Sequence, residues 1–145
     1  MKKKLLNSIT ALIICTLCFS SCKKEATIDP AEQFIGNYTG TLNYSHPFIG
    51  NGSATDNNAK IAKVEANKIA LIAPQLGTPA YFTVSGNTIN EVPSTLDMPI
   101  DAAGTLASHT ETSTGTLVNG TITINGTWLR NGTGIGNFQI VLIKR

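Results

Sequence analysis

The sequence has little charge, few aromatic residues and no cysteine after position 22. Charged residues make up 14% of the 145 residues, and aromatic residues make up 6%. Without the lysines at positions 2–4, eight basic residues face nine acidic ones, so no basic surplus remains to bind nucleic-acid phosphates. The low charge also argues against a disordered chain. A domain that begins after Cys22 can form no internal disulfide.

Threonine and asparagine, by contrast, are abundant, with 19 and 13 copies. Threonine favours strands and asparagine favours turns, and both are poor in helix interiors. The composition therefore argues against a helical bundle or a coiled coil. The length fits a single domain.

The first 21 residues have the layout of a secretory signal peptide. A positive stretch, 1–4, precedes an apolar stretch, 5–19, and small residues then lead into Cys22. A membrane-spanning helix would need about 20 mostly apolar residues. Because the apolar stretch is shorter and Lys23 follows closely, we expect a segment that is removed rather than a permanent span.

The residues Phe19-Ser20-Ser21-Cys22 resemble the lipobox of bacterial lipoproteins, although Phe19 stands where that family usually has an aliphatic residue. In that family the signal is cleaved before the cysteine, which then carries a diacylglycerol and a further acyl chain such as palmitate. The resemblance implies a lipid anchor at Cys22 that binds the protein to a membrane. Lys23 stands where aspartate commonly retains lipoproteins in the inner membrane, so the resemblance implies the outer membrane, in either leaflet. A secreted protein with an unmodified cysteine is the alternative.

This layout divides the chain into three segments. We expect residues 1–21 to be removed, residues 22–33 to form the acylated cysteine and a flexible polar tether, and residues 34–145 to form one folded domain. The tether, fully extended, would hold the domain at most about 35 Å from the bilayer.

Both ends of this domain alternate with a period of two, as half-buried strands do. From Phe34 to Tyr44 every second residue is aromatic, glycine or leucine, and the intervening residues from 37 onward are asparagine or threonine. Near the C-terminus, Phe138, Ile140 and Leu142 share one face of a strand expected over about 134–144.

Two asparagine-glycine pairs, Asn119-Gly120 and Asn131-Gly132, predict tight hairpin turns, because such turns need positive φ at their central positions. The triplet Asn-Gly-Thr recurs three times at a spacing of six, which is also a pattern of hexapeptide solenoids. A solenoid needs many more coils, so we interpret the repeat as the two turns with a β-bulge at Gly126 between them.

The middle of the domain is expected to contain short strands, at 61–64, 69–73, 81–84, 88–92 and 105–118. A helix over 59–71 is the alternative, but the apolar residues there keep no helical stripe. Residues 46–56 are interpreted as a mobile loop and residues 93–104 as a longer connection. Eight or nine antiparallel strands predict an all-β fold, either a small closed barrel or a two-sheet sandwich.

The segment 34–42, FIGNYTGTL, resembles the opening strand of lipocalin-like (calycin-like) domains, where Gly-x-Trp or Gly-x-Tyr begins the barrel. Here Tyr38 occupies the position that is tryptophan in true lipocalins. The segments 115–117 and 121–124 and the ending Lys144-Arg145 are similar to small lipoproteins of Gram-negative bacteria with such domains. The resemblance implies a barrel that holds a ligand in its interior.

Residues typical of metal binding and catalysis are sparse. The histidines, His46 and His109, are 63 positions apart, and we interpret them as solvated surface residues. A metal site shared with Glu111 or Asp56 is conceivable, but no closely spaced ligand pair supports it. The segment 56–58 lacks the glutamate that ends an EF-hand calcium loop. We therefore assign no metal ligand and no cofactor.

No nucleophile elbow, zinc-protease pair or phosphate-binding loop occurs in the sequence. Three acidic residues, Glu91, Asp97 and Asp101, flank the connection expected at 93–104, so a carboxylate pair for glycoside hydrolysis is left open. Without a recognisable motif, we assign no catalytic residue and expect the protein not to be an enzyme.

Large side chains that could line a barrel interior are Tyr38, Tyr44, Tyr81, Phe82, Trp128 and Phe138. We take the three tyrosines with Trp128 and Phe138 as candidate ligand-binding residues. The first hypothesis is a lipid-anchored cell-envelope protein that holds a small apolar or amphipathic molecule in its barrel. The second is an envelope interaction protein, an accessory subunit or inhibitor, with a filled barrel and a protein partner.

Overall fold

The structure is a computed structural model that describes residues 29–77 and 79–145. The predicted signal peptide, the lipid anchor at Cys22 and most of the predicted tether lie outside the described residues. Among the described residues, no helix is long and apolar enough to cross a membrane.

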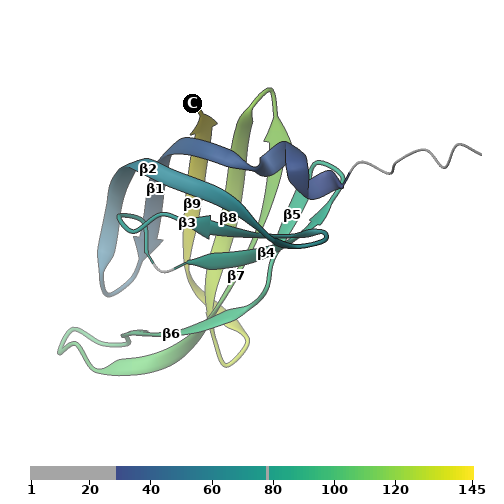
Figure 1. The fold of residues 1–145 in the computed structure, drawn as a ribbon. Coiled ribbons are helices and arrows are strands. Elements are labelled where there is room, and N and C mark those ends of the chain that lie inside the picture. The colour runs from purple at the N-terminus through teal and green to yellow at the C-terminus, as the bar shows by residue number, and fades with distance from the viewer. Residues whose placement is uncertain (1–28, 78) are drawn as a thin grey trace, which may run out of the picture.

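The described chain consists of a short 3₁₀ helix followed by nine strands (Figure 1). The elements are η1 (Pro30–Phe34), β1 (Gly36–His46), β2 (Gly50–Glu65), β3 (Lys68–Ile72), β4 (Ala80–Ser85), β5 (Thr88–Glu91), β6 (Ser94–Pro99), β7 (Leu106–Val118), β8 (Thr121–Arg130) and β9 (Thr133–Lys144). The all-β prediction is confirmed, and the alternative helix over 59–71 is replaced by parts of β2 and β3.

Eight of the strands form a closed antiparallel barrel. The order runs from β5 through β4, β3, β2 and β1 to β9, β8 and β7, and pairing of β5 with β7 closes the circle. The predicted barrel is therefore confirmed, and the two-sheet sandwich is not formed. Closure gives each of these eight strands a partner on both sides, although the first half of β2 pairs with β1 alone.

The ninth strand, β6, lies within the segment 93–104, where we expected a connection without strands. β5 and β6 pair with successive parts of β7: Ile89 is opposite Gly115, and Leu96 is opposite His109. Pro93 stands between the two strands, and β6 pairs with β7 alone. The β6–β7 hairpin therefore extends past the end of β4, as Figure 1 shows.

The β1–β2 connection is shorter than expected. We interpreted 46–56 as a loop, but β2 begins at Gly50, and the whole of its first half pairs with β1. Glycine, asparagine and serine are weak strand formers, so this segment gave no strand pattern. Its long antiparallel partner β1 supplies the hydrogen bonds that hold it extended.

The asparagine-glycine turns form as predicted. Asn119 and Asn131 have φ of 49° and 51°, and the glycine after each is also positive. The bulge expected at Gly126 is instead between Trp128 and Leu129. Gly126 is regularly paired, and a Cβ there would overlap the ring of Phe138, so this glycine makes room for an aromatic neighbour.

One end of the barrel is closed by η1. The side chain of Phe34, the last residue of η1, is fully buried, and the hydroxyl of Tyr38 donates a hydrogen bond to the Phe34 carbonyl. Asp29 caps the helix by accepting from the Ala31 amide at 2.9 Å. Residues 30–33, which the sequence led us to place in the tether, therefore form part of η1.

Candidate functional site

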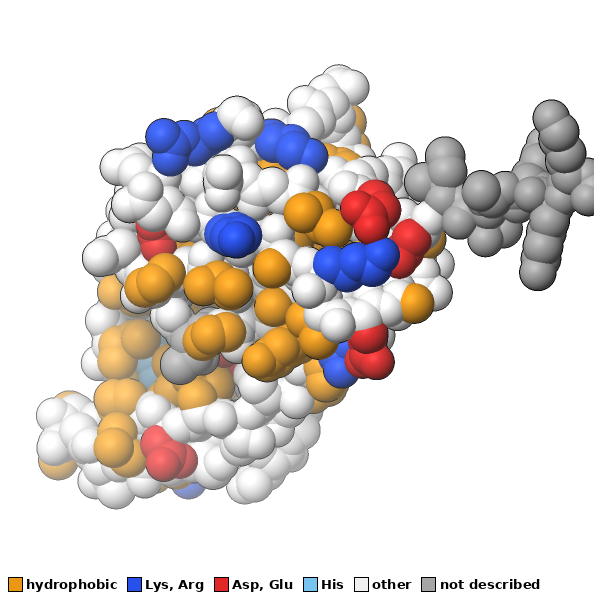
Figure 2. All heavy atoms as spheres, viewed as in Figure 1, with side chains coloured by type: hydrophobic (Ala, Val, Ile, Leu, Met, Phe, Trp, Pro, Cys, Tyr) orange, Lys and Arg blue, Asp and Glu red, His pale blue; other side chains and the backbone are white. Residues whose placement is uncertain are grey.

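A cavity of about 280 Å³ lies inside the other half of the barrel. Its mouth is between the β3–β4 connection and β6, where Gly77, Pro79 and Leu96 stand at the wall. Figure 2 shows hydrophobic side chains gathered on this face, in the region between the β3–β4 connection and the β6–β7 hairpin. Apolar residues form most of the lining: Leu42, Leu71, Ala73, Leu76, Pro79, Ala80, Leu96, Trp128, Phe138 and Ile140.

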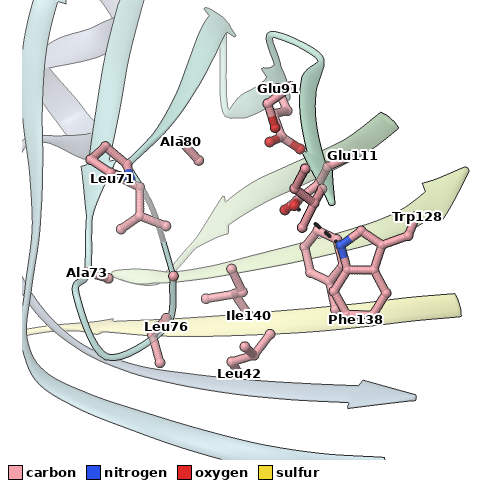
Figure 3. Close-up of a pocket in the computed structure, with 14 residues that line it drawn as sticks. Leu42, Leu71, Ala73, Leu76, Ala80, Glu91, Glu111, Trp128, Phe138 and Ile140 are labelled. Atoms are coloured by element: carbon pink, nitrogen blue, oxygen red, sulfur yellow. Dashed lines mark hydrogen bonds between the residues drawn. The ribbon is translucent and has the colours of Figure 1, made fainter. Parts of the chain in front are cut away.

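Strand alternation places these side chains inside. Every second residue points inward, so β1 contributes Leu42, β8 contributes Trp128, and β9 contributes Phe138 and Ile140. The Trp128 and Phe138 rings are 5.1 Å apart between centroids and make one end of the lining (Figure 3). Aliphatic side chains make the opposite end.

Asp56 holds the β3–β4 connection at the mouth. Its buried carboxylate accepts hydrogen bonds from the backbone amides of Asn58, at 2.7 Å, and Gln75, at 3.0 Å. The neighbouring amide of Leu76 donates to the Ala73 carbonyl at 2.8 Å. These bonds fix the segment that carries Leu76 into the cavity, so we assign Asp56 a structural role.

Two carboxyl groups, from Glu91 on β5 and Glu111 on β7, face the cavity (Figure 3). Glu91 is only 9% exposed, and its Oε2 accepts a hydrogen bond from the Ser113 hydroxyl at 2.6 Å. Glu111 is half-buried, and its Oε2 accepts from the Trp128 indole N–H at 3.3 Å.

Burial changes the protonation of both acids. Loss of solvent raises the pKa of Glu91 from 4.5 to about 7; the Ser113 hydrogen bond opposes this rise and the negative charge of Glu111 adds to it. Burial likewise raises the pKa of Glu111, against the effect of the Trp128 hydrogen bond. Near neutral pH the cavity thus contains a carboxyl, Glu91, that can be charged or neutral.

The two histidines are buried, so our expectation of solvated surface residues is wrong. His46 is 3% exposed and His109 is 1% exposed, and their ring centroids are 6.4 Å apart. They are inward residues of β1 and β7, far apart in sequence but near each other inside the barrel. The indole of Trp128 lies 5.8 Å from His46, between centroids.

Backbone contacts give the two imidazoles opposite tautomers. Nδ1 of His46 accepts from the amides of Phe48 and Ile49, both at 3.3 Å, so its proton is on Nε2. Nδ1 of His109 donates to the Ala107 carbonyl at 2.7 Å, so its Nε2 carries a lone pair. Neither Nε2 has a partner within the described residues. Burial lowers the pKa of His46, and electrostatic repulsion from His109 lowers it further.

This arrangement does not form a recognisable metal centre. Among residues 29–77 and 79–145, no three His, Cys, Asp or Glu side chains group as metal ligands. Because Nε2 of His46 holds its proton, this nitrogen has no lone pair with which to bind a metal ion beside His109.

The predicted ligand-binding residues are separated by the fold. Trp128 and Phe138 line the cavity. Tyr44 is half-buried with its ring 6.5 Å from that of Trp128, outside the lining. Tyr38 lies under η1 in the packed half of the barrel. Phe82 is buried outside the cavity lining, and Tyr81 is 47% exposed on the outer face of β4.

Of the acidic residues weighed for hydrolysis, only Glu91 reaches the cavity. Asp97 is exposed on β6, and Asp101 accepts hydrogen bonds from the amides of Ala103 and Thr105 in its own turn. The second carboxyl is Glu111, which sequence reasoning considered only beside His109. The sequence could have predicted this position, because every second residue back from Leu117 through Ser113 shares one face of the strand, and Glu111 is on that inward face.

The closed eight-stranded barrel is consistent with the lipocalin-like resemblance at the level of architecture. A shared architecture does not establish membership of a family or a common ligand. The chain matches no protein-family model, and a comparison with curated proteins finds no significant match.

Proposed function

We propose that the protein is a lipid-anchored binding protein of the cell envelope that holds a small apolar or amphipathic molecule inside its barrel. The observation that carries this proposal is the apolar cavity with a mouth between the β3–β4 connection and β6. Its volume of about 280 Å³ is near the lower end for ligand pockets, which favours a small molecule.

The cavity also bears on the alternative hypothesis. An interaction protein with a filled barrel needs no inward space, and here aliphatic and aromatic side chains enclose one. Apolar surface around an open space favours an apolar occupant, because covering that surface removes it from water. The binding role is therefore the better supported of the two.

Within the described part of the chain, neither histidine is hydrogen-bonded to a carboxylate. A general base that is oriented by a carboxylate is thus missing from the cavity region.

The lipid anchor is supported by the sequence around Cys22, which lies outside the described residues. Acyl chains contribute about 0.8 kcal/mol per buried CH₂, so several chains hold a protein firmly on a bilayer. Metabolic labelling with a clickable palmitate should mark the natural protein and not the Cys22→Ala variant. Equal labelling of both would overturn the anchor and leave the cavity unaffected.

Ligand binding can be followed through Trp128, the one tryptophan in the sequence. We expect a short bromoalkyl alcohol, titrated into the full-length protein in phosphatidylcholine vesicles, to quench Trp128 fluorescence with saturation. Bromine quenches on contact, and Trp128 is part of the cavity wall.

Two alanine variants test whether the quencher occupies the cavity. Ala80→Phe adds bulk at the lining, whereas Ala62→Phe adds the same bulk on the outward face of β2. Saturable quenching should be lost in the first and kept in the second. Quenching that never saturates, or that both variants retain equally, would reject the cavity as a binding site and favour the interaction protein.

A further inference from the structure

The cavity contains two negative groups and no positive one. The lining of the cavity includes Glu91 and Glu111 but no lysine, arginine or histidine. In the described part of the chain, ion pairs join Lys63 to Asp29 and Glu32, and Lys68 to Glu65; neither cavity acid takes part in one.

The partners of these two acids are both neutral. Oε2 of Glu91 accepts a hydrogen bond from the Ser113 hydroxyl, and Oε2 of Glu111 accepts one from the Trp128 indole N–H. No hydrogen bond reaches Oε1 of either residue from any described group. A buried carboxylate without a cation is costly, because neutral donors replace only part of the lost hydration.

The remainder of the cavity has the opposite character. In Figure 3 the two carboxyl groups lie on one side, and Leu42, Leu76 and Ile140 lie on the other. This layout suits a molecule with one polar, positively charged end and one apolar end.

An ammonium group fits the acidic side better than other polar heads. It carries a positive charge and several N–H donors, so it can serve both carboxylates at once. An alcohol donates a single neutral hydrogen bond. A fatty-acid carboxylate would add a third negative charge beside two others, which is repulsive.

We propose that the ligand is a small primary amine with an apolar body, whose ammonium group binds between Glu91 and Glu111 and whose body contacts the aliphatic wall. This inference rests on the proposed binding function. It narrows the proposed class of ligand from any small apolar or amphipathic molecule to one with a positive charge.

The test compares three ligands with the same tail: hexylamine, hexanol and hexanoate. Each is used to displace the bromoalkyl alcohol from full-length protein in phosphatidylcholine vesicles at about pH 8, above the pKa of about 7 that burial gives Glu91. Vesicles without protein correct for partition into lipid. We expect hexylamine to bind about tenfold more tightly than hexanol, and hexanoate to bind weakest.

Variants identify the groups responsible. Glu91→Gln and Glu111→Gln should each weaken hexylamine binding by about fivefold or more and change hexanol binding by less than about twofold. Unchanged hexanol binding also shows that each variant keeps a folded cavity. Asp97→Asn, on the exposed face of β6, is the matched control and should leave all three affinities as they are.

The outcomes separate the two proposals. If hexanol binds in the cavity as tightly as hexylamine, or if the glutamine variants keep the preference for the amine, this inference is overturned and the binding function stands. If none of the three displaces the bromoalkyl alcohol and that alcohol itself does not saturate, both proposals fail together.

Discussion

At the η1 end of the barrel, Phe34 of η1 and the inward side chains of Tyr38, Ile69, Ile122 and Leu142 are fully buried and belong to the hydrophobic core cluster. At the β6 end the same alternation places acids, imidazoles and an open space among apolar side chains. At one end the helix η1 supplies Phe34 as a large buried side chain, whereas at the other end β6 pairs with β7 alone. The packed core is therefore concentrated at the η1 end of the barrel, and the buried titratable side chains lie at the β6 end.

The largest expected effect is at the packed end. Phe34→Ala should lower the free energy of unfolding by about 3–5 kcal/mol, because it leaves a cavity beneath η1 that its neighbours cannot fill. Denaturant unfolding of the full-length protein measures this loss. Phe48→Ala removes the same atoms from a residue that is 48% exposed at the other end, and should cost less than about 1 kcal/mol. Similar losses in both variants would remove the contrast between the two ends.

The next effect is the pH dependence that the cavity end should impose on stability. Between pH 4.5 and about 7, folded Glu91 retains a proton that the unfolded chain releases, because its pKa is raised. The contribution of Glu91 to stability is therefore greatest below this range and falls as the pH rises through it, by on the order of 2 kcal/mol. Urea midpoints at a series of pH values report the slope.

Glu91→Gln should flatten this slope, while Asp97→Asn should keep it. Glu111 also has a raised pKa, so a smaller slope of the same sign should remain in Glu91→Gln. A slope that is identical in Glu91→Gln and the natural protein would mean that Glu91 does not hold the proton.

The smallest effect is expected from two matched Ala→Leu substitutions, one in each half of the barrel. Ala59→Leu, at a fully buried position opposite Tyr38, should destabilise the protein by about 1–3 kcal/mol through overpacking. Ala73→Leu adds the same atoms into the cavity wall and should change stability by less than about 1 kcal/mol. Denaturant midpoints compare the two. Equal destabilisation would show that the cavity half is packed as tightly as the other.

Much of the barrel could be read from local patterns. The alternation in β1 and β9 and the turns at Asn119 and Asn131 depend on side-chain direction and positive φ, which are properties of a few consecutive residues. Where local preference was weak, prediction failed. The polar first half of β2 and the strand β6 are held extended by their partners, and the bulge was displaced from Gly126 to the Trp128–Leu129 step.

The candidate site was less predictable. Trp128 and Phe138 were identified from their size and from strand alternation. Tyr81, however, points to the outer face of β4, and Tyr38 lies at the packed end. Glu111 was passed over because its importance depends on Glu91, which is 20 positions away in the sequence. Only closure of β5 against β7 brings these two acids to one wall.

By itself, the sequence determined an all-β domain of eight or nine antiparallel strands, because strand periodicity and turn chemistry act over a few residues. Tertiary structure alone decided which inward residues meet. It buried His46 with His109, placed Glu91 and Glu111 on one wall of the cavity, and buried Phe34 at the opposite end. The physical reason is that burial and charge interactions depend on distance in space, which the closure of the barrel sets and the order of residues does not.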